Sequence, residues 1–482
     1  MDFNLTEKLY EMKEKGKYPM HMPGHKRSVK MQKYGNELGL PYEFDITEID
    51  GYDNLHAPEG ILKELGESAA SLYGAKRAYP LVNGSTAGII SAIGACAKNN
   101  NIIVSRASHR SVYSAIEIFS LEPTYIYPEI IEEYGIFGSV SAADVEDAFN
   151  KEPEASVVVL TSPTYEGVIS NIQEIADVVH AHNALLVIDC AHGAHLGFTQ
   201  NEYIPDSYIR YADIAIVSLH KTLPSLTQTA LCLSFSRAAD ELDQKIRHYL
   251  SIFMTSSPSY ILLASIDKCL SIVKNHGGEL FSEYTAMLSE FENRVASLEN
   301  ISVIGYGAST TEKTCFAFDR GKINVFSGSL VDFAGNKITA EILAKFLRLN
   351  GFEPEMVSRD YLILMTSIMD DADKIRKLAE LLCNFDKWCV KDKACNDTLL
   401  YPEPSIKMTV SDVARCDFEI REFSHCENCV SLDYIMCYPP GIPIVCPGEE
   451  ITREVISFVD ACRESGVNVI GAETIKVKKQ EL

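Results

Sequence analysis

The chain has 482 residues, too many for one ordinary hydrophobic core, so we expect two or three domains. Its formal net charge of −23 argues against nucleic-acid binding, which needs a basic surface. No apolar run approaches the roughly 20 residues of a membrane span, the first residues lack a signal-peptide core, and the cysteines lie scattered like reduced buried thiols, so we expect a cytoplasmic protein.

The N-terminal half begins irregularly and then alternates between two patterns. Residues 6–15 predict a short helix within an N-terminal arm. From about residue 55 to 240, helical segments such as 171–182 alternate with strand-like ones. The apolar runs of strand length are 102–105, 156–160, 185–188, 214–217 and 231–235. This alternation predicts an α/β fold with a mostly parallel sheet covered on both faces.

Beyond residue 240 the pattern is mainly helical. Helices are expected over 240–248 and 259–274, and the second is placed to bridge towards another domain. Amphipathic helices over 338–349 and 372–384 indicate a smaller α+β unit. The predicted regions are an N-terminal arm (1–50), a large domain (51–270), a small α+β domain (271–394) and a C-terminal domain (395–482).

Lys221 is the most informative residue of the chain. It follows the apolar run 214–217 directly, and open α/β sheets bind their ligands at the carboxyl ends of strands. A buried lysine is rare unless it is paired or used. The run 185–188 ends in the same way at Asp189. A lysine and an aspartate on neighbouring strand ends suit pyridoxal phosphate (PLP), whose aldehyde forms a Schiff base with the amine while the carboxylate keeps the pyridine nitrogen protonated.

Asp189 and His192 allow other interpretations. A buried carboxylate is costly unless it is paired, and a pyridinium nitrogen is one possible partner. A helix cap is an alternative, and the spacing of Asp189, His192 and His195 is also that of metal ligands. No carboxylate-rich cluster accompanies these residues, so we expect no metal.

Two further segments add polar groups to the same predicted site. Small residues and hydroxyls at 83–88 precede an apolar helix over 89–97, and a helix N-terminus is favourable for a phosphate. The alternative is an ordinary turn with an N-cap. His109 follows the strand at 102–105, where it could stack on an aromatic ring or be structural. The placement of all these segments on strand ends predicts one PLP site.

The chain resembles the bacterial ornithine/lysine/arginine decarboxylases, which are PLP enzymes of the aspartate-aminotransferase-like fold (fold type I). The resemblance covers most of residues 18–265 and returns near the C-terminus. It implies a PLP domain with a mostly parallel seven-stranded sheet and smaller α+β C-terminal domains. The motifs that carry it are HMPGHK (21–26), FDITEI (44–49), LHAPEG (55–60), VNGST (82–86), TYEG (164–167), HGAH (192–195), HKTLPSLTQT (220–229), SPSY (257–260) and YPPGIP (438–443).

The resemblance also implies roles for individual residues. Lys221 would carry the Schiff base, Asp189 would pair with the pyridine nitrogen, and His109 would stack on the ring opposite Ala191. The phosphate and the rest of the cofactor would be held by Ser85, Thr86, His192, Ser218 and His220. Ser256 and Ser257 would reach the phosphate of the neighbouring subunit, which implies a homodimer with shared sites, or a higher oligomer built from it.

The implied reaction is decarboxylation of a basic amino acid in polyamine metabolism: arginine to agmatine, lysine to cadaverine or ornithine to putrescine. Similarity to the short, bacillus-type members favours arginine. Lys221 or His220 would protonate the α-carbon. The distal cation of the substrate needs an acidic partner, for which Asp53, Glu166 and Glu355 are candidates, each of which could instead be a surface or capping carboxylate.

The chain departs from the family pattern at three positions near the expected site. Cys190 stands where glutamate is usual, Ser108 where cysteine is common and Ser256 where threonine is common. None of these changes removes a group that the chemistry needs. They leave the substrate preference and the role of the C-terminal region open.

Three alternatives stand beside decarboxylation. An aminotransferase or aldolase of the same fold is one, and Arg359 could then clamp a substrate carboxylate. A non-catalytic regulatory paralogue is another, although it would have no physical reason to keep Lys221, Asp189 and His109 together. A small zinc site at His425, Cys426 and Cys429, with Cys416 or Cys437 as a further ligand, is the third, but one Cys-x-x-Cys without a second pair is a weak signal.

Overall fold

The computed structural model describes residues 3–15, 20, 22–23, 25–28, 39–236, 239–306, 315–392, 400–438 and 441–479. His21 and Gly24 of the HMPGHK motif, residues 439–440 of YPPGIP and the predicted boundary at 395 lie outside these residues. Within the described ranges, no helix combines the length and the apolar character that crossing a membrane requires.

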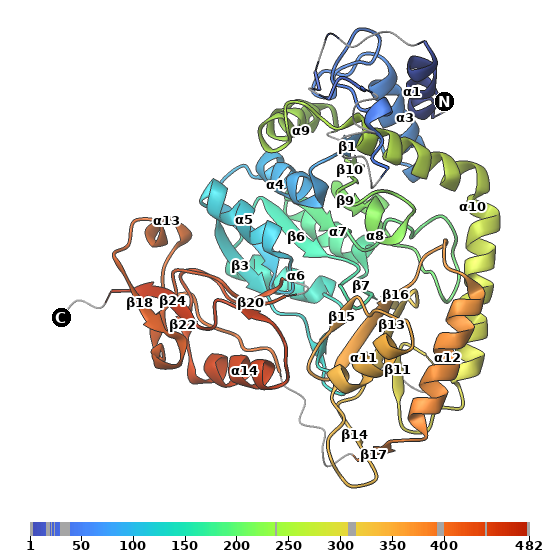
Figure 1. Ribbon diagram of the computed structural model, residues 1–482. Coiled ribbons are helices and arrows are strands. Elements are labelled where there is room, and N and C mark those ends of the chain that lie inside the picture. Colours follow the sequence, from blue (N-terminus) through green and yellow to red (C-terminus); the bar gives the residue numbers. More distant parts are fainter. Residues whose placement is uncertain are drawn as a thin grey trace.

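A seven-stranded sheet forms the centre of the large domain (Figure 1), and its strand order is β1-β10-β9-β8-β6-β2-β3. The strands are β1 (Arg77–Leu81), β2 (Asn101–Ser105), β3 (Glu122–Ile126), β6 (Val157–Thr161), β8 (Leu185–Asp189), β9 (Ile214–Ser218) and β10 (Ala230–Ser234). From β9 to β3 all neighbours are parallel, whereas β10 pairs antiparallel with both β9 and β1. The predicted mostly parallel sheet of fold type I is therefore confirmed.

Helices connect these strands, and side-chain caps fix where several of them begin. The Ser141 side chain accepts from the backbone N–H of Asp144 in a capping box, and Asn171 caps the next helix in the same way. The helices are α1 (Leu5–Glu14), α3 (Ile61–Tyr73), α4 (Gly84–Cys96), α5 (Arg110–Phe119), α6 (Ala142–Lys151), α7 (Ile172–Ala181), α8 (Leu219–Thr222) and α9 (Ala239–Phe253). Because β6, β8 and β9 run parallel, their carboxyl ends lie together at one edge of the sheet.

The long helix α10 (Tyr260–Val295) joins the large domain to a small one, as Figure 1 shows. It continues through residue 270, where the sequence predicts a domain boundary. The small domain holds an antiparallel sheet in the order β11-β13-β16-β15, together with two helices. Its elements are β11 (Ser302–Ile304), β13 (Lys322–Phe326), β15 (Met356–Val357), β16 (Tyr361–Met365), α11 (Ala340–Leu349) and α12 (Ala372–Asp386).

Short strand pairs complete the domains and link them. β7 (Val168–Ile169) of the large domain pairs with β12 (Ala317–Phe318), which lies between β11 and β13 of the small sheet in the chain, and so ties the two domains together. The other pairs outside the C-terminal domain are β4 (Ile130–Ile131) with β5 (Ile136–Phe137), and β14 (Leu330–Val331) with β17 (Val390–Lys391).

The C-terminal domain has its own hydrophobic core, which includes Cys426, Cys429 and Cys437. Its elements are α13 (Val410–Val413), β18 (Phe418–Glu422), β19 (Cys429–Val430), β20 (Ile435–Cys437), β21 (Pro443–Val445), β22 (Glu450–Ile451), α14 (Arg453–Glu464), β23 (Val469–Ile470) and β24 (Thr474–Lys478). A buried ion pair between Arg106 and Glu449, 3.1 Å long, anchors this domain on the large one. The segment before β21 thereby comes to lie at the carboxyl edge of the large sheet.

Candidate active site

A cavity of about 500 Å³ opens where the carboxyl ends of β6, β8 and β9 meet. Residues from all three large parts of the chain surround it. They are Gly84, Ser85, Thr86, Ala107, His109, Thr161, Tyr165, Asp189, Ala191, His192, His220, Lys221, Thr227, Gln228, Glu355, Tyr438 and Ile442. The structure thus brings most of the residues predicted for the cofactor to one place.

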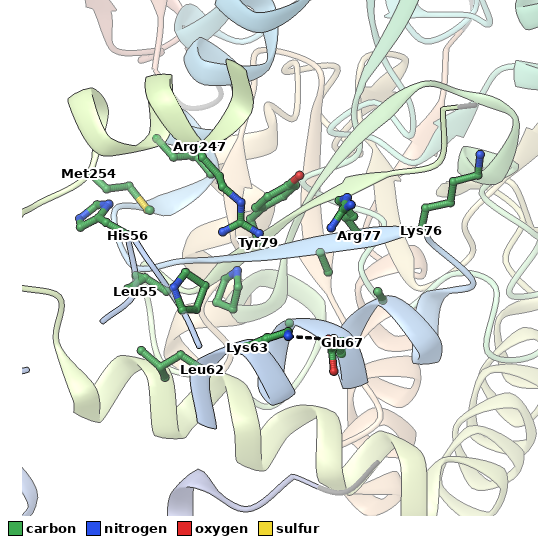
Figure 2. Close-up of a pocket in the computed structure, with 16 residues that line it drawn as sticks. Leu55, His56, Leu62, Lys63, Glu67, Lys76, Arg77, Tyr79, Arg247 and Met254 are labelled. Atoms are coloured by element: carbon green, nitrogen blue, oxygen red, sulfur yellow. Dashed lines mark ion pairs between the residues drawn. The ribbon is translucent and has the colours of Figure 1, made fainter. Parts of the chain in front are cut away.

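A second hollow of about 210 Å³ lies between α3, β1 and α9 (Figure 2). Lys63 and Glu67 in its lining pair with each other at 4.0 Å, and Arg247 pairs with Asp243 at 3.0 Å. Arg77 pairs with Asp240 and Asp243 as well. Because these charges neutralise one another, the larger cavity at the strand ends is the better candidate for chemistry.

Lys221 lies in the single turn of α8, directly after β9. Its Nζ is 3.0 Å from Nε2 of His192. Burial lowers the pKa of Lys221, while the nearby carboxylates of Asp189 and Glu355 oppose that shift. The amine is therefore neutral more often than an ordinary lysine is, as a nucleophilic amine requires.

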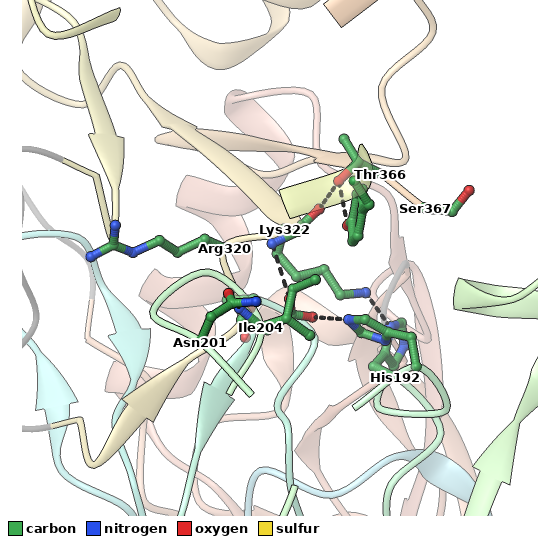
Figure 3. A network of polar contacts seen from close by, with 12 residues as sticks. His192, Asn201, Ile204, Arg320, Lys322, Thr366 and Ser367 are labelled. Atoms are coloured by element: carbon green, nitrogen blue, oxygen red, sulfur yellow. Dashed lines mark hydrogen bonds and ion pairs between the residues drawn. The ribbon is translucent and has the colours of Figure 1, made fainter. Parts of the chain in front are cut away.

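His192 lies between two lysines. In addition to its contact with Lys221, its Nδ1 is 2.8 Å from Nζ of Lys322, the first residue of β13. Figure 3 shows the side chains of Lys322 and His192 pointing toward each other. Burial and the two lysines hold the pKa of His192 well below its ordinary value. Lys322 is not predicted from the sequence, because no residue spacing links β13 to His192, some 130 residues away.

Asp189 approaches the cavity from the end of β8, and His109 from the start of α5. Asp189 is 2% exposed, and its Oδ1 accepts the backbone N–H of Ala191 at 3.1 Å. His109 is the N-cap of α5, where its Nδ1 accepts the N–H of Ser111 at 3.2 Å. Desolvation by the surrounding protein lowers the pKa of His109. The ring is thus held in place through one nitrogen and is neutral at physiological pH.

The polar residues predicted for a phosphate occupy different positions. Ser85 and Thr86 line the cavity at the start of α4, after Gly84, whose φ of 74° turns the chain into the helix. Ser218 is fully buried, and its Oγ has no hydrogen-bond partner in the described structure. Ser256 and Ser257 are exposed and are not among the residues that line this cavity.

His220 lines the cavity beside Lys221. Its Nδ1 lies 2.9 Å from the carbonyl oxygen of Thr229, which fixes the ring. Burial lowers the pKa of His220, although this contact works in the opposite direction.

The three candidate partners for the distal cation of a substrate lie in three different places. Glu355 lines the cavity and accepts the hydroxyl of Tyr165 at 2.7 Å. Glu166 is buried behind it, in a smaller cavity that also contains Arg359. Asp53 accepts the backbone N–H groups of Gly60 and Leu62 at the start of α3.

These positions favour one candidate. Burial would raise the pKa of Asp53, but its backbone hydrogen bonds outweigh burial and lower that pKa. Asp53 therefore caps α3 and lies outside this cavity. Of the three carboxylates, Glu355 alone lines the cavity that contains Lys221. Arg359, considered as a carboxylate clamp, is also absent from its lining.

The C-terminal domain closes one side of the cavity with Tyr438 and Ile442. A Cβ atom on Gly441 would lie 3.9 Å from the ring of His109, so this segment passes close over the ring. Among the described residues, no group of histidine, cysteine and carboxylate side chains could hold a metal ion. Cys426 donates instead to the carbonyl oxygen of Glu422 at 3.2 Å, and Cys429 lies in the same core.

The side chains around the cavity fit PLP. The open N-terminus of α4, where Ser85 and Thr86 line the cavity, suits a phosphate, whereas Ser218 is not among the lining residues. A buried carboxylate, Asp189, suits a protonated ring nitrogen, and the flat ring of His109 suits an aromatic face. Lys221 supplies the amine for an aldehyde.

Comparisons with known proteins agree with this site. The family model for the Orn/Lys/Arg decarboxylase major domain matches residues 4–327, and the model for the C-terminal domain of the same family matches residues 391–475. An arginine decarboxylase of Bacillus subtilis (strain 168) is 30% identical over 465 residues, which cover 94% of this chain and 92% of the relative.

Solved structures agree on the fold. The constitutive lysine decarboxylase of Escherichia coli has a TM-score of 0.81 at 19% identity, over 98% of this chain and 82% of that one. A serine palmitoyltransferase of Sphingomonas wittichii has a TM-score of 0.51 at 16% identity, over 67% of this chain and 76% of that one. The likeness to the second enzyme covers only part of this chain, whereas the likeness to the first covers nearly all of it.

Proposed function

Because the chain belongs to the Orn/Lys/Arg decarboxylase family and is a PLP-dependent amino-acid decarboxylase, we propose that it converts L-arginine to agmatine. The arginine decarboxylase compared above is 30% identical, against 19% for the lysine enzyme. The observation that carries the proposal is Glu355, a carboxylate held by Tyr165 in the cavity of Lys221. An aminotransferase is less well supported, because Arg359 lies outside that cavity.

The cofactor residues have the roles that their positions support. When bound, PLP supplies an aldehyde that captures the amine and a ring that withdraws electrons from the α-carbon. Lys221 would hold the aldehyde, and Asp189 would keep the ring nitrogen protonated. His109 would cover one face of the ring and Ala191 the other. The phosphate would be held by Ser85, Thr86, Ser218 and His220, with His192 beside the Lys221 amine.

Glu355 would bind the distal cation of the substrate. Its carboxylate is fixed by the Tyr165 hydroxyl at 2.7 Å, so it is oriented before a substrate arrives. A guanidinium donates through a planar fork that matches a carboxylate, and this geometry favours arginine over a shorter ammonium side chain. Glu166 is excluded from direct contact by its burial, and its Oε1 already accepts from Tyr361 at 2.8 Å.

Two side chains are placed to return a proton to the α-carbon. Lys221 and His220 lie on consecutive positions at the cavity wall. The N–H at His220 Nδ1 donates to the Thr229 carbonyl oxygen, so its Nε2 would return a proton only after taking one up. Tyr438 and Ile442 would limit access of water, which favours loss of carbon dioxide over side reactions.

The active form would be a homodimer. Ser256 and Ser257 lie outside their own cavity and are exposed, as expected of residues that complete a site in the neighbouring subunit. Co-expression of a Lys221→Ala chain with a Ser256→Ala/Ser257→Ala chain would then create one intact site per mixed dimer. Activity above the sum of the two separate variants supports shared sites, whereas a simple sum contradicts them.

The decisive experiment incubates the purified holoenzyme separately with arginine, lysine and ornithine. Carbon dioxide and the amine product are measured. Agmatine formed with a kcat/KM well above that for the other two substrates supports the proposal. A preference for lysine or ornithine would overturn the choice of arginine, and amino-group transfer without carbon dioxide would contradict decarboxylation itself.

A further inference from the structure

A second lysine lies behind the active site. Lys322 begins β13 of the small domain and is 1% exposed, so it is not part of the cavity wall. Its Nζ lies 2.8 Å from Nδ1 of His192, whose Nε2 lies 3.0 Å from Nζ of Lys221. The three side chains therefore form a continuous row that runs from the cavity into the small domain; Figure 3 shows the part formed by His192 and Lys322.

Backbone packing fixes Lys322 in this row. Its N–H donates to the carbonyl oxygen of Asp319 at 3.1 Å, and its side chain lies against Gly167 of the TYEG motif. A Cβ atom on Gly167 would lie 3.0 Å from Cγ of Lys322, so this position favours glycine. In the part of the chain that the structure describes, Lys322 forms no ion pair, because the Asp319 carboxylate pairs with His195 at 3.2 Å.

Elementary hydrogen-bond counting limits the protons that this row can hold. A charged lysine is a donor only, and a neutral imidazole has one donor nitrogen and one acceptor nitrogen. A neutral His192 can therefore accept from one charged lysine while it donates to the other, which must then be a neutral amine. Two charged lysines would require two acceptor nitrogens on His192, and one of the two contacts would be lost.

We propose that Lys322 is a positioning residue that shares one proton with Lys221 through His192. In one state the proton is on Lys221, and His192 donates from Nδ1 to a neutral Lys322. In the other, a proton has passed from Lys221 to Nε2 while the Nδ1 proton has passed to Lys322. One N–H bond forms for each that breaks, and no electrons are transferred. Lys221 is then a neutral amine while Lys322 carries the charge.

The exchange matches what the decarboxylase needs from Lys221. A free amino acid arrives as an ammonium ion and must lose protons before its nitrogen can form a new bond, and Lys221 must be a neutral amine to recapture the cofactor. Lys322 gives such a proton a place inside the protein, away from solvent. This inference rests on the proposed role of Lys221, but it can be tested on the amine itself, separately from carbon dioxide release.

The surrounding charges are consistent with a proton that can move. Burial lowers the pKa of Lys322 to about 8, while Asp319 opposes the shift and Lys221 adds to it. Burial likewise lowers the pKa of Lys221. Burial thus lowers the pKa of both amines, so a neutral form of either lysine is more accessible in this row than in solvent.

The test measures the pKa of Lys221 directly. The full-length chain is stripped of cofactor with hydroxylamine and labelled with trace acetic anhydride at a series of pH values, and the label on Lys221 is quantified by mass spectrometry. In Lys322→Met, Lys221 becomes the only amine in the row, and we expect its pKa to rise by about one unit. In Lys322→Arg, a permanent charge donates to His192, so the pKa of Lys221 should stay at or below the wild-type value.

Two controls separate this exchange from general effects. Arg320→Met removes a cation two residues away that pairs with Glu292 instead of His192, and it should leave the pKa of Lys221 unchanged. If Lys322→Arg fails to fold, as judged by circular dichroism, the contrast between Lys322→Met and Arg320→Met decides the question. The proposal is overturned if the Met and Arg variants shift the pKa of Lys221 in the same direction, or if neither differs from Arg320→Met.

A double-mutant cycle tests whether His192 carries the coupling. In a His192→Phe background, the Lys322→Met change should move the pKa of Lys221 by much less than in the wild type, because the bridge is gone. An undiminished shift would mean that the lysines interact only through space, which overturns the exchange through His192. The same variants assayed for carbon dioxide show whether decarboxylation persists, so the two proposals can fail separately.

Discussion

The chain buries charge in two places, and the two are built differently. At the junction with the C-terminal domain, Arg106 donates to Glu449 at 3.1 Å, to two backbone carbonyl oxygens and to the hydroxyl of Tyr113. Behind the active site, Lys221 and Lys322 share a single imidazole. The first cluster matches a cation with an anion, whereas the second places two bases around a third.

The difference separates a structural charge from a chemical one. A guanidinium cannot lose its proton, and a set of well-directed acceptors holds it in one place. Two lysines with lowered pKa values on either side of a histidine whose pKa is also lowered are not held in one charge state in this way. Removal of a group should therefore cost stability at the first cluster and activity at the second. Variants at each cluster can test this division between stability and activity.

The largest effect is expected from Lys221→Ala. Loss of the amine that holds the cofactor should reduce the rate of carbon dioxide release by roughly 10³-fold or more. The urea midpoint should stay the same or rise, because the change removes an amine whose charged form is penalised by burial. Activity assays and urea unfolding on the same preparation measure both effects. A variant that unfolds early would mean that the lysine cluster also holds the fold together.

Glu449→Leu should show the opposite behaviour. It leaves Arg106 as a buried cation without its anion, which costs about 3–5 kcal/mol of stability. Urea unfolding should show this loss, while Glu450→Gln, which changes a partly exposed neighbour that pairs with Lys407, should be close to neutral. The double variant Arg106→Met/Glu449→Leu should recover much of the loss. If Glu449→Leu is as mild as Glu450→Gln, Arg106 is not the anchor of this domain.

The stability contributed by the cluster of Lys221, His192 and Lys322 should depend on pH. The folded chain lowers the pKa of Lys322 from 10.5 to about 8, so between these pH values the unfolded chain binds more protons. Below about pH 8, the buried charge of Lys322 lowers the free energy of unfolding. As the pH rises toward 10.5, Lys322 is neutral in the folded chain and this loss of stability disappears. Relative to Lys322→Met, the wild type should gain roughly 3 kcal/mol over this range. Urea unfolding of both proteins at a series of pH values measures the difference, and a constant difference would contradict a charged, buried Lys322.

The sequence predicts the central strands of the large sheet but not its two edge strands. The apolar runs at 102–105, 156–160, 185–188, 214–217 and 231–235 correspond within one residue at each end to strands of the sheet. The apolar runs do not predict β1 and β3, which form the two edges of the sheet and each contain a proline. An edge strand pairs on one side only, so it tolerates proline and polar residues that hide it from a hydrophobicity pattern.

Helix ends and long-range contacts show a second limit. The helix predicted over 259–274 continues to Val295, through a His-Gly-Gly sequence that indicates a helix end. Packing of its apolar side chains overrides that local signal. Most residues predicted for the cofactor meet in one cavity because strand order places them there. The position of Lys322 depends on how two domains pack, which no spacing along the chain encodes.

The smallest expected effect tests Glu355, a carboxylate of the cavity that belongs to neither cluster. Glu355→Gln keeps the shape and the contact with Tyr165 but removes the charge that a guanidinium would pair with. A lost charge-assisted hydrogen bond should lower kcat/KM for arginine by about 10- to 100-fold. Glu353→Gln is the matched control, since that exposed carboxylate pairs with Arg348, and it should leave kcat/KM unchanged. Equal effects of both changes would show that Glu355 only adds to the negative field of the chain, and another group would then have to recognise the distal cation.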